Sequence, residues 1–277
     1  MSFYVITSMV ALMNMLFKKQ KSFVRFYSLV PGLKELYPII PAKELKRKWI
    51  LENQTTSKCP VKKILGSGGK EHLGHSANCP GINKLVDTGW ILCAPADFTI
   101  KTFGQGQDFK FEVPILFEEN YHWISSHPPA ITECLLDRPA DTLNSIVKID
   151  TPWRIQTSDD IVLLQQHVPY NNQPYFTAAS GIVDPKYSHE ANVQLFWHTL
   201  EGEVTIKAGT PLIQYIPISR KHIQNSFYDF SVQDADEQDK YVEEAFNYAK
   251  RSSFLKNVSL GDRIAKTIKV TSLNKRR

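Results

Sequence analysis

Apolar and polar residues alternate with a period of two in several segments from the middle of the chain. Val193, Leu195 and Trp197 are each separated by one residue, and the segment 109–113 reads FKFEV. A period of two places successive side chains on opposite faces of an extended strand. These segments are therefore predicted to be β-strands with one face more buried than the other.

Short β-rich segments of this kind recur at close spacing, and residues that favour turns separate them. The predicted strands cover residues 89–95, 97–102, 109–113, 146–149, 153–156, 160–164, 193–197, 204–207 and 212–216. Many short strands with turn signals between them are typical of sandwiches and barrels. The sequence thus predicts a mainly β protein, either an antiparallel sandwich or a β-clip-like barrel, with a C-terminal helix.

Turn residues also predict how neighbouring strands pair. The segment GQGQ at 104–107 is expected to join the strands on either side of it in a hairpin. Farther along, turns at 200–203 and 208–211 are expected to fold residues 193–216 into a tight antiparallel meander. Both motifs pair strands that are adjacent in the sequence.

Two segments have helical character, and they suggest a division of the chain. Residues 233–251 are acidic at the start and basic at the end, the charge order that suits a helix dipole. Residues 44–53 are predicted to form a shorter helix. We predict an N-terminal segment at 1–54, a β-rich domain at 55–228 and a helical C-terminal appendage at 229–277.

The first residues are apolar and permit three interpretations. Residues 2–17 are fewer than the roughly 20 that a membrane-spanning helix needs, and no basic residue precedes them as in a signal peptide. In order of preference they form a core or interface segment, an extension upstream of a start at Met9, Met13 or Met15, or a short membrane anchor. No transmembrane span is predicted.

Composition and charge narrow the classes of function. The chain is 42% hydrophobic and 22% charged, as in an ordinary globular protein, so disorder is not expected. Its formal charge of +5 lies partly at the two ends, and no long basic face with interleaved aromatic residues appears. The sequence therefore gives no strong signal of nucleic-acid binding. Four cysteines in a chain of this length favour a reducing compartment.

One Gly-rich segment contains candidate metal ligands. Cys59, His72, His75 and Cys79 are the residue types that zinc prefers, and they allow a tetrahedral structural zinc site. No C-x-x-C pair is present, however, and the known zinc modules use regular paired spacing. The other interpretation is a surface loop with exposed histidines and a buried Cys79 before a Pro-Gly turn.

The segment 180–218 resembles a known superfamily. It contains GIVDPKY at 181–187, then a strand, then TIKAGTPLIQYIPI at 205–218. This arrangement resembles the C-terminal half of the dUTPase and dCTP deaminase superfamily, in which the aspartate lies beside the sugar and the water that attacks or is displaced. The resemblance implies a pyrimidine deoxynucleotide as ligand, with Asp184 and Tyr187 as the matching catalytic positions.

The same region also resembles half of a cupin. LEGEV at 200–204, followed by a Gly turn and a strand, is similar to the cupin pattern. Cupins bind a metal through histidines and a glutamate, so the resemblance implies His189, Glu190 and His198 as ligands of a metal-dependent enzyme. Histidines that are structural parts of half-buried strands are the other interpretation.

A longer pattern extends over most of the chain. NCPG, TGWIL, TPWRI and GTPLIQYIPI together resemble an uncharacterised protein family of T4-like cyanophages and other bacteriophages. This resemblance implies a phage-encoded protein of the host cytoplasm or the virion, with further copies of itself or other phage proteins as partners. We expect a β-rich binding or virion-associated protein without demonstrated catalysis, because an active site requires several positioned groups and Asp184 is the only acid of the superfamily that is in register. A pyrimidine deoxynucleotide hydrolase or deaminase is the alternative.

Overall fold

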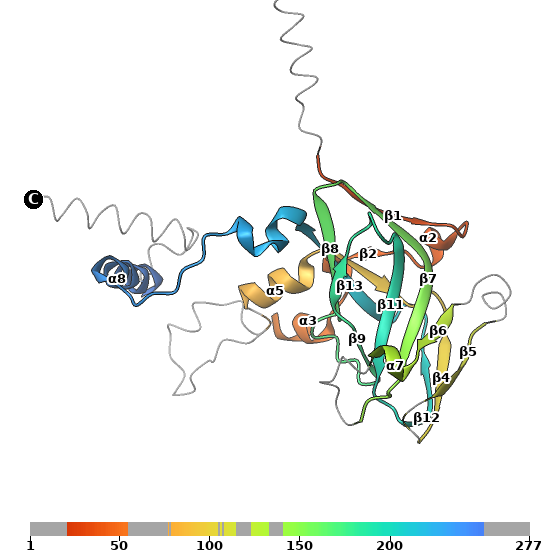
Figure 1. The fold of residues 1–277 in the computed structure, drawn as a ribbon. Coiled ribbons are helices and arrows are strands. Elements are labelled where there is room, and N and C mark those ends of the chain that lie inside the picture. The colour runs from red at the N-terminus through yellow and green to blue at the C-terminus, as the bar shows by residue number, and fades with distance from the viewer. Residues whose placement is uncertain are drawn as a thin grey trace, which may run out of the picture. The chain divides into compact units, whose positions relative to one another are not determined.

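The structure is a computed structural model that describes residues 21–54, 77, 79–104, 106, 108–114, 123–132 and 141–251. The chain divides into two compact units, Met1–Asn225 and Ser226–Arg277. The first unit is built mainly from antiparallel strands, and the described part of the second contains a helix (Figure 1). The predicted fold class, mainly β with a C-terminal helix, is confirmed.

The described strands form three sheets, which are not joined into a closed barrel. The first sheet has the order β1 (Val24–Ser28), β7 (Ile146–Thr157), β11 (Glu190–Trp197) and β9 (Phe176–Ala178), and β6 (Ile124–His127) also pairs with β7. The second has the order β10 (Gly181–Val183), β8 (Ile161–Gln166), β13 (Pro211–Ser219), β3 (Trp90–Cys93) and β2 (Ile40–Pro41). The third has the order β12 (Glu201–Ile206), β4 (Phe98–Phe103) and β5 (Phe109–Glu112).

The described helices of the first unit are short. They are α2 (Leu33–Leu36), α3 (Lys48–Gln54), α5 (Pro80–Asp87), α7 (Pro129–Thr132) and the 3-10 turns η1 (Ala42–Glu44) and η3 (Arg220–Ile223). The 3-10 turn η4 (Asn225–Phe227) spans the boundary between the units, and α8 (Glu237–Arg251) belongs to the second. Among the described helices, none combines the length and the apolar character that crossing a membrane requires.

The hydrophobic core takes side chains from all three sheets. Trp197, Tyr215 and Phe98, from the first, second and third sheet respectively, are among the largest fully buried side chains. Phe176 stacks on Trp197 with ring centroids 6.2 Å apart, and Phe98 meets Trp123 edge to face at 5.6 Å. Burial of this apolar surface is the main favourable contribution to folding.

The alternation along 193–197 is confirmed, but the predicted meander is wrong. Val193, Leu195 and Trp197 are fully buried within β11. The next two strands leave the sheet of β11, because β12 pairs with β4 in the third sheet and β13 pairs with β3 and β8 in the second. The turn also comes earlier than predicted, since Glu201 and Gly202 already belong to β12. Local alternation specifies a strand, whereas its partners come from distant parts of the chain.

Strand β7 corrects a second prediction. Residues 146–149 and 153–156 were expected to be separate strands, yet they form one strand that includes Pro152. Its neighbours change along its length, because β6 pairs with Ile146–Ile149 and β1 pairs with Trp153–Thr157. Pro152 lies between these two stretches, and on its β11 side it lies at the register shift between Glu190 and Asn192, the kind of irregularity at which a sheet tolerates proline.

The predicted hairpin and the C-terminal helix are both present. β4 and β5 pair directly, with Thr102 opposite Phe109. Helix α8 begins after Asp236, whose carboxylate accepts a hydrogen bond from the Asp239 backbone N–H at 2.8 Å. The Asp239 carboxylate accepts one from the Asp236 backbone N–H at 3.2 Å. This reciprocal cap satisfies backbone donors that a helix start otherwise leaves free.

Candidate functional site

Three strands of the second sheet bring charged residues together at one end. β10 and β13 both pair antiparallel with β8, so they run parallel to each other on its two sides. Asp184 follows β10, Arg220 follows β13, and Asp159 and Asp160 precede β8. We call these four residues, together with Lys186, the strand-end cluster.

Asp184 and Arg220 form a bidentate ion pair. The Arg220 Nη2 group donates to Asp184 Oδ1 at 2.8 Å, and Nη1 donates to Oδ2. Arg220 also donates from Nε to the Asp159 carbonyl at 2.8 Å and from its backbone N–H to the Asp160 carbonyl at 2.7 Å. Lys186 Nζ lies 3.2 Å from Asp159 Oδ1. The planar guanidinium therefore fixes the orientation of the Asp184 carboxylate.

The ion pair sets the charge state of Asp184. Hydrogen bonds from Arg220 lower the pKa of the Asp184 carboxyl below its ordinary value of 3.8, partial burial opposes this, and the Lys186 backbone N–H adds to the lowering. General base catalysis works best with a pKa near the operating pH, so a carboxylate with a lowered pKa is a weak base. In this arrangement Asp184 fixes the local structure and accepts protons poorly.

The same aspartate organises the turn that carries Tyr187. The Asp184 carbonyl accepts hydrogen bonds from the backbone N–H groups of Tyr187 at 2.9 Å and Ser188 at 3.1 Å. The Tyr187 residue is 89% exposed. An aromatic side chain held in the open by a fixed turn is the type of group that anchors protein interfaces.

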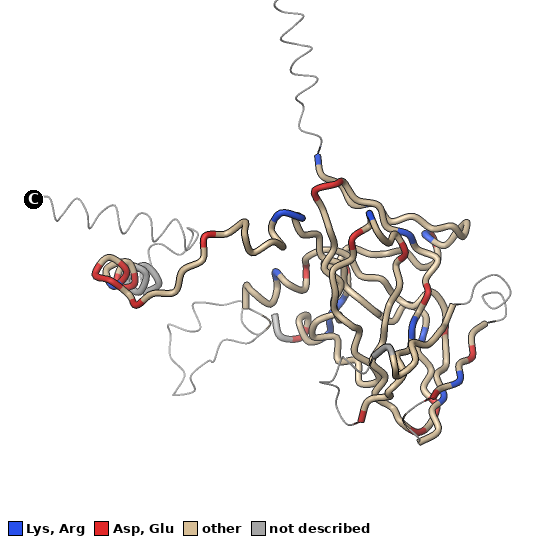
Figure 2. Tube along the Cα trace, in the orientation of Figure 1, with Lys and Arg blue, Asp and Glu red and all other residues tan. Residues whose placement is uncertain are grey.

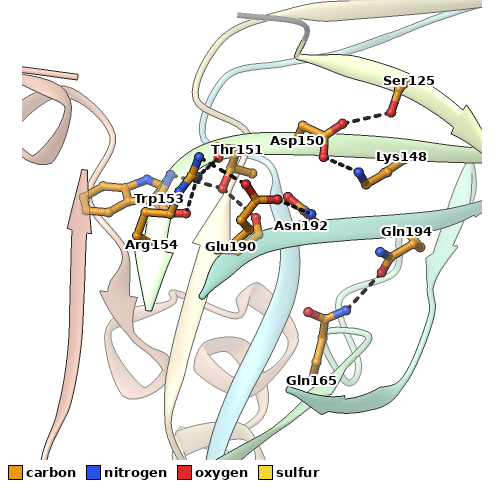
Figure 3. A network of polar contacts seen from close by, with 11 residues as sticks. Ser125, Lys148, Asp150, Thr151, Trp153, Arg154, Gln165, Glu190, Asn192 and Gln194 are labelled. Carbon is orange, nitrogen blue, oxygen red and sulfur yellow. Dashed lines mark hydrogen bonds and ion pairs between the residues drawn. The ribbon is translucent and has the colours of Figure 1, made fainter. Parts of the chain in front are cut away.

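Glu190 belongs to a separate polar network on β7 and β11 (Figure 3). Its Oε1 lies 3.5 Å from Arg154 Nη2, and its Oε2 accepts a hydrogen bond from Asn192 at 3.2 Å. Arg154 Nη1 also donates to the carbonyls of Thr151 and Trp153, each at 3.0 Å. The register between β11 and β7 shifts between Glu190 and Asn192, so the network lies at an irregular point of the ladder.

The three cupin-like candidates do not come together. His198 lies between two threonine hydroxyls, with Nδ1 3.1 Å from Thr142 Oγ1 and Nε2 2.8 Å from Thr177 Oγ1. The backbone carbonyl of His189 accepts a bond from β7, and Glu190 is held by Arg154 as described. Within the described residues, no group of three or more His, Cys, Asp or Glu side chains is placed to hold a metal ion.

Three of the four predicted zinc ligands, Cys59, His72 and His75, lie outside the described residues. Cys79 is described and is exposed, so the expectation of a buried cysteine is wrong. It is the N-cap of α5, and the Pro80-Gly81 pair begins this helix instead of forming a turn, because proline suits the first helical position. The zinc site stays a prediction, to be tested by metal analysis and by the effect of a chelator on the melting temperature.

Arg220 is the ion-pair partner of Asp184, and the sequence did not single it out. It stands 36 positions from Asp184 and two residues beyond the end of the motif at 205–218, so it belongs to no motif. The available signal was its position directly after a strand, but its partner became evident only with the strand order.

Comparison with known proteins gives only distant similarity. No family profile and no curated protein sequence matches the chain. The native dUTPase of EIAV is similar in structure with a TM-score of 0.28 and 16% identity, over 55% of this chain and 85% of that one. A mutant dUTPase from phage phi11 of S. aureus gives a TM-score of 0.30 and 9% identity, over 55% of this chain and 84% of that one. Values this low carry no argument about function.

Proposed function

We propose that the chain is a β-rich binding protein without catalytic activity, and that the turn carrying Tyr187 is part of its contact surface. The observation that carries this proposal is that the Asp184 carboxylate is held in an ion pair. Both of its carboxylate oxygens are bound by Arg220, while Tyr187, three residues later, is 89% exposed. The acid is engaged in structure, and the aromatic group is available for contact.

The surface charge agrees with a protein partner. Acidic and basic positions are interspersed along the described part of the chain (Figure 2). Lys186 beside Tyr187 is paired with Asp159. An exposed aromatic group surrounded by paired charges matches an interface anchor with a polar rim. The partner is a second copy of this chain or another protein encoded with it.

The resemblance to the uncharacterised phage protein family supports a proposal about the origin and location of the protein. Its segments NCPG, TGWIL, TPWRI and GTPLIQYIPI are spread over most of the sequence. We propose on this basis that the protein is phage-encoded and acts in the host cytoplasm or as part of the virion.

The test of contact compares two exposed tyrosines. Tyr187 is 89% exposed and Tyr170 is 50% exposed, and Tyr170 contacts Trp49 edge to face at 5.8 Å. Self-association is measured by sedimentation for wild type, Tyr187→Ala and Tyr170→Ala. We expect Tyr187→Ala to weaken association by about tenfold or more, as at an interface anchor, and Tyr170→Ala to leave it unchanged. Equal association of all three would remove Tyr187 from the contact surface.

The alternative is a pyrimidine deoxynucleotide hydrolase or deaminase in which Asp184 and Tyr187 are catalytic. The placement of both residues on one turn favours it, because Tyr187 has an open face on which a base could stack. Incubation with dUTP and dCTP discriminates between the two functions. We expect neither turnover nor a shift in melting temperature. Turnover by wild type that Asp184→Asn abolishes, with the fold intact, would establish the alternative.

A further inference from the structure

A hollow of about 400 Å³ lies between two sheet edges, away from the strand-end cluster. Its described lining consists of Asp108, Phe109, Phe111, Ser125, Ser126 and Ser145. β5 pairs only with β4 among the described strands, and β6 pairs only with β7. The hollow is therefore bounded by the outer strand of the third sheet and by a side strand of the first.

Strand register directs the two aromatic rings into this hollow. Phe109 is opposite Thr102 and Phe111 is opposite Ile100, and both partners on β4 are buried. Side chains opposite one another in an antiparallel pair lie on the same face of the sheet. Phe109 and Phe111 thus lie on the inner face of β5, whereas Glu112, opposite Thr99, lies on the outer face.

Two polar groups of the described lining, Asp108 and Ser125, are hydrogen-bond acceptors. Ser125 donates its hydroxyl proton to Asp150 Oδ2 at 2.8 Å, which leaves its oxygen free to accept. Asp150 is itself neutralised by Lys148, 2.6 Å from its Oδ1. The side chains of Asp108 and Ser126 form no hydrogen bond or ion pair with other residues of the described chain. A ligand with hydrogen-bond donors therefore suits Asp108 and Ser125.

The charge of the lining further limits the chemical class of the ligand. The lining residues that the structure describes include one carboxylate, Asp108, and no lysine or arginine, so this part of the hollow disfavours a phosphate or a carboxylate. The aromatic rings offer apolar faces suited to the C–H face of a saturated ring. A volume near 400 Å³ is at the lower end of the range for small-molecule sites.

We infer that this hollow between β5 and β6 binds a neutral polyhydroxylated ring, such as one sugar unit. Asp108 and Ser125 accept hydrogen bonds from the hydroxyl groups of the ring, and Phe111 packs against its carbon face. Ser126 either donates or accepts. The site is small and its residues Asp108 and Phe111 are exposed to solvent, so the affinity for a single sugar unit is in the millimolar range. The inference does not depend on the Tyr187 surface, and Tyr187→Ala leaves sugar binding unchanged.

The experiment measures saturation-transfer NMR signals and chemical-shift titrations of the full chain with glucose, galactose and mannose. We expect at least one sugar to bind with saturation. Asp108→Ala and Phe111→Ala should each weaken binding by about tenfold or more, because each removes a direct contact. Glu112→Gln is the matched control, since it lies on the same strand with its side chain on the opposite face, and it should leave the affinity unchanged.

Two further ligands test the chemical class. Ethanolamine represents a cationic donor and inorganic phosphate represents an anion. Neither is expected to bind more tightly than the sugars, and circular dichroism should show both alanine variants folded, since Asp108 and Phe111 are exposed. The inference is overturned if no sugar binds, if both alanine variants retain full affinity, or if either charged ligand binds more tightly.

Discussion

The core around Trp197 and the strand-end cluster around Asp184 belong to the same β unit, but different forces hold them together. Trp197 is fully buried and packs against Phe176, so its contribution comes from apolar surface removed from water. Asp184 and Arg220 lie near the surface, with 17% and 28% of their side chains exposed. Their attraction is weakened by solvent and by salt.

Because of this difference, the core mainly affects the stability of the domain, and the strand-end cluster mainly affects the position of the Tyr187 turn. Loss of a core side chain removes many contacts at once and leaves a cavity in a tightly packed interior. Loss of the ion pair releases one turn and one end of a sheet. The strand-end cluster therefore determines how Tyr187 is presented, while the core determines whether the domain folds.

The largest expected effect is in the core. Trp197→Ala should lower the free energy of unfolding by about 3–5 kcal/mol, the usual cost of removing a large buried aromatic group. Phe196→Ala is the matched control, because Phe196 is the adjacent residue of β11 and faces the other side of the sheet, where it is half-buried. Urea unfolding of both variants measures the difference. Equal losses in the free energy of unfolding would show that the two faces of β11 contribute equally to stability, which would contradict this prediction.

Backbone packing should give the next largest effect. Gly89 has a φ of 78°, and a Cβ at this position would lie 1.9 Å from the Tyr215 carbonyl oxygen. Gly209 has a similar φ of 81° but no atom within 4 Å of such a Cβ. Gly209→Ala should lower the free energy of unfolding by about 1 kcal/mol, because alanine disfavours the left-handed conformation. Gly89→Ala should lower it by more, because the backbone at Tyr215 must also move away from the new Cβ. A smaller loss for Gly89→Ala in thermal unfolding would contradict this.

Much of the core could be predicted from local sequence. The alternation of Val193, Leu195 and Trp197 identifies both the strand and its buried face, because the side-chain period of a strand is two. The partners of this strand could not be predicted, since β12 and β13 join other sheets. Pairing is decided by contacts between distant segments, which local alternation does not contain.

The candidate site could be predicted only in part, for the same reason. Asp184 and Tyr187 were found through a short motif, and the structure places both on one turn. Arg220 was missed because its relation to Asp184 depends on β10 and β13 lying on the two sides of β8. The motif identifies one partner of an ion pair, and the topology supplies the other.

A smaller effect is expected from pH at the edge of the core. Burial, together with the nearby His198, lowers the pKa of His167 below 6.5, and its Nδ1 accepts a hydrogen bond from the Ala178 backbone N–H at 3.2 Å. The folded state thus favours the neutral ring. The stability contribution is present above the ordinary pKa and is lost as the pH falls below it, because the unfolded chain takes up the proton first.

The measurement for His167 is the melting temperature from about pH 7.5 to about pH 5.5. Wild type should lose stability over this range, and His167→Gln should lose less because it cannot titrate. Parallel curves for the two proteins would exclude His167 as a source of the pH dependence.

The smallest effect is expected at the strand-end cluster, where charge is exposed to solvent. Asp184→Asn should lower the melting temperature slightly at neutral pH, because the amide cannot balance the charge of Arg220. The lowered pKa of Asp184 means that its contribution is present above 3.8 and is lost as the pH falls through the lowered value. The difference between wild type and variant should therefore shrink between about pH 7 and about pH 3, and also on addition of salt. Asp234→Asn, at an exposed position in the second unit, is the control and should show no difference at either pH. A difference for Asp184→Asn that is independent of both pH and salt would mean that the shape of the side chain, and not its charge, holds the Tyr187 turn.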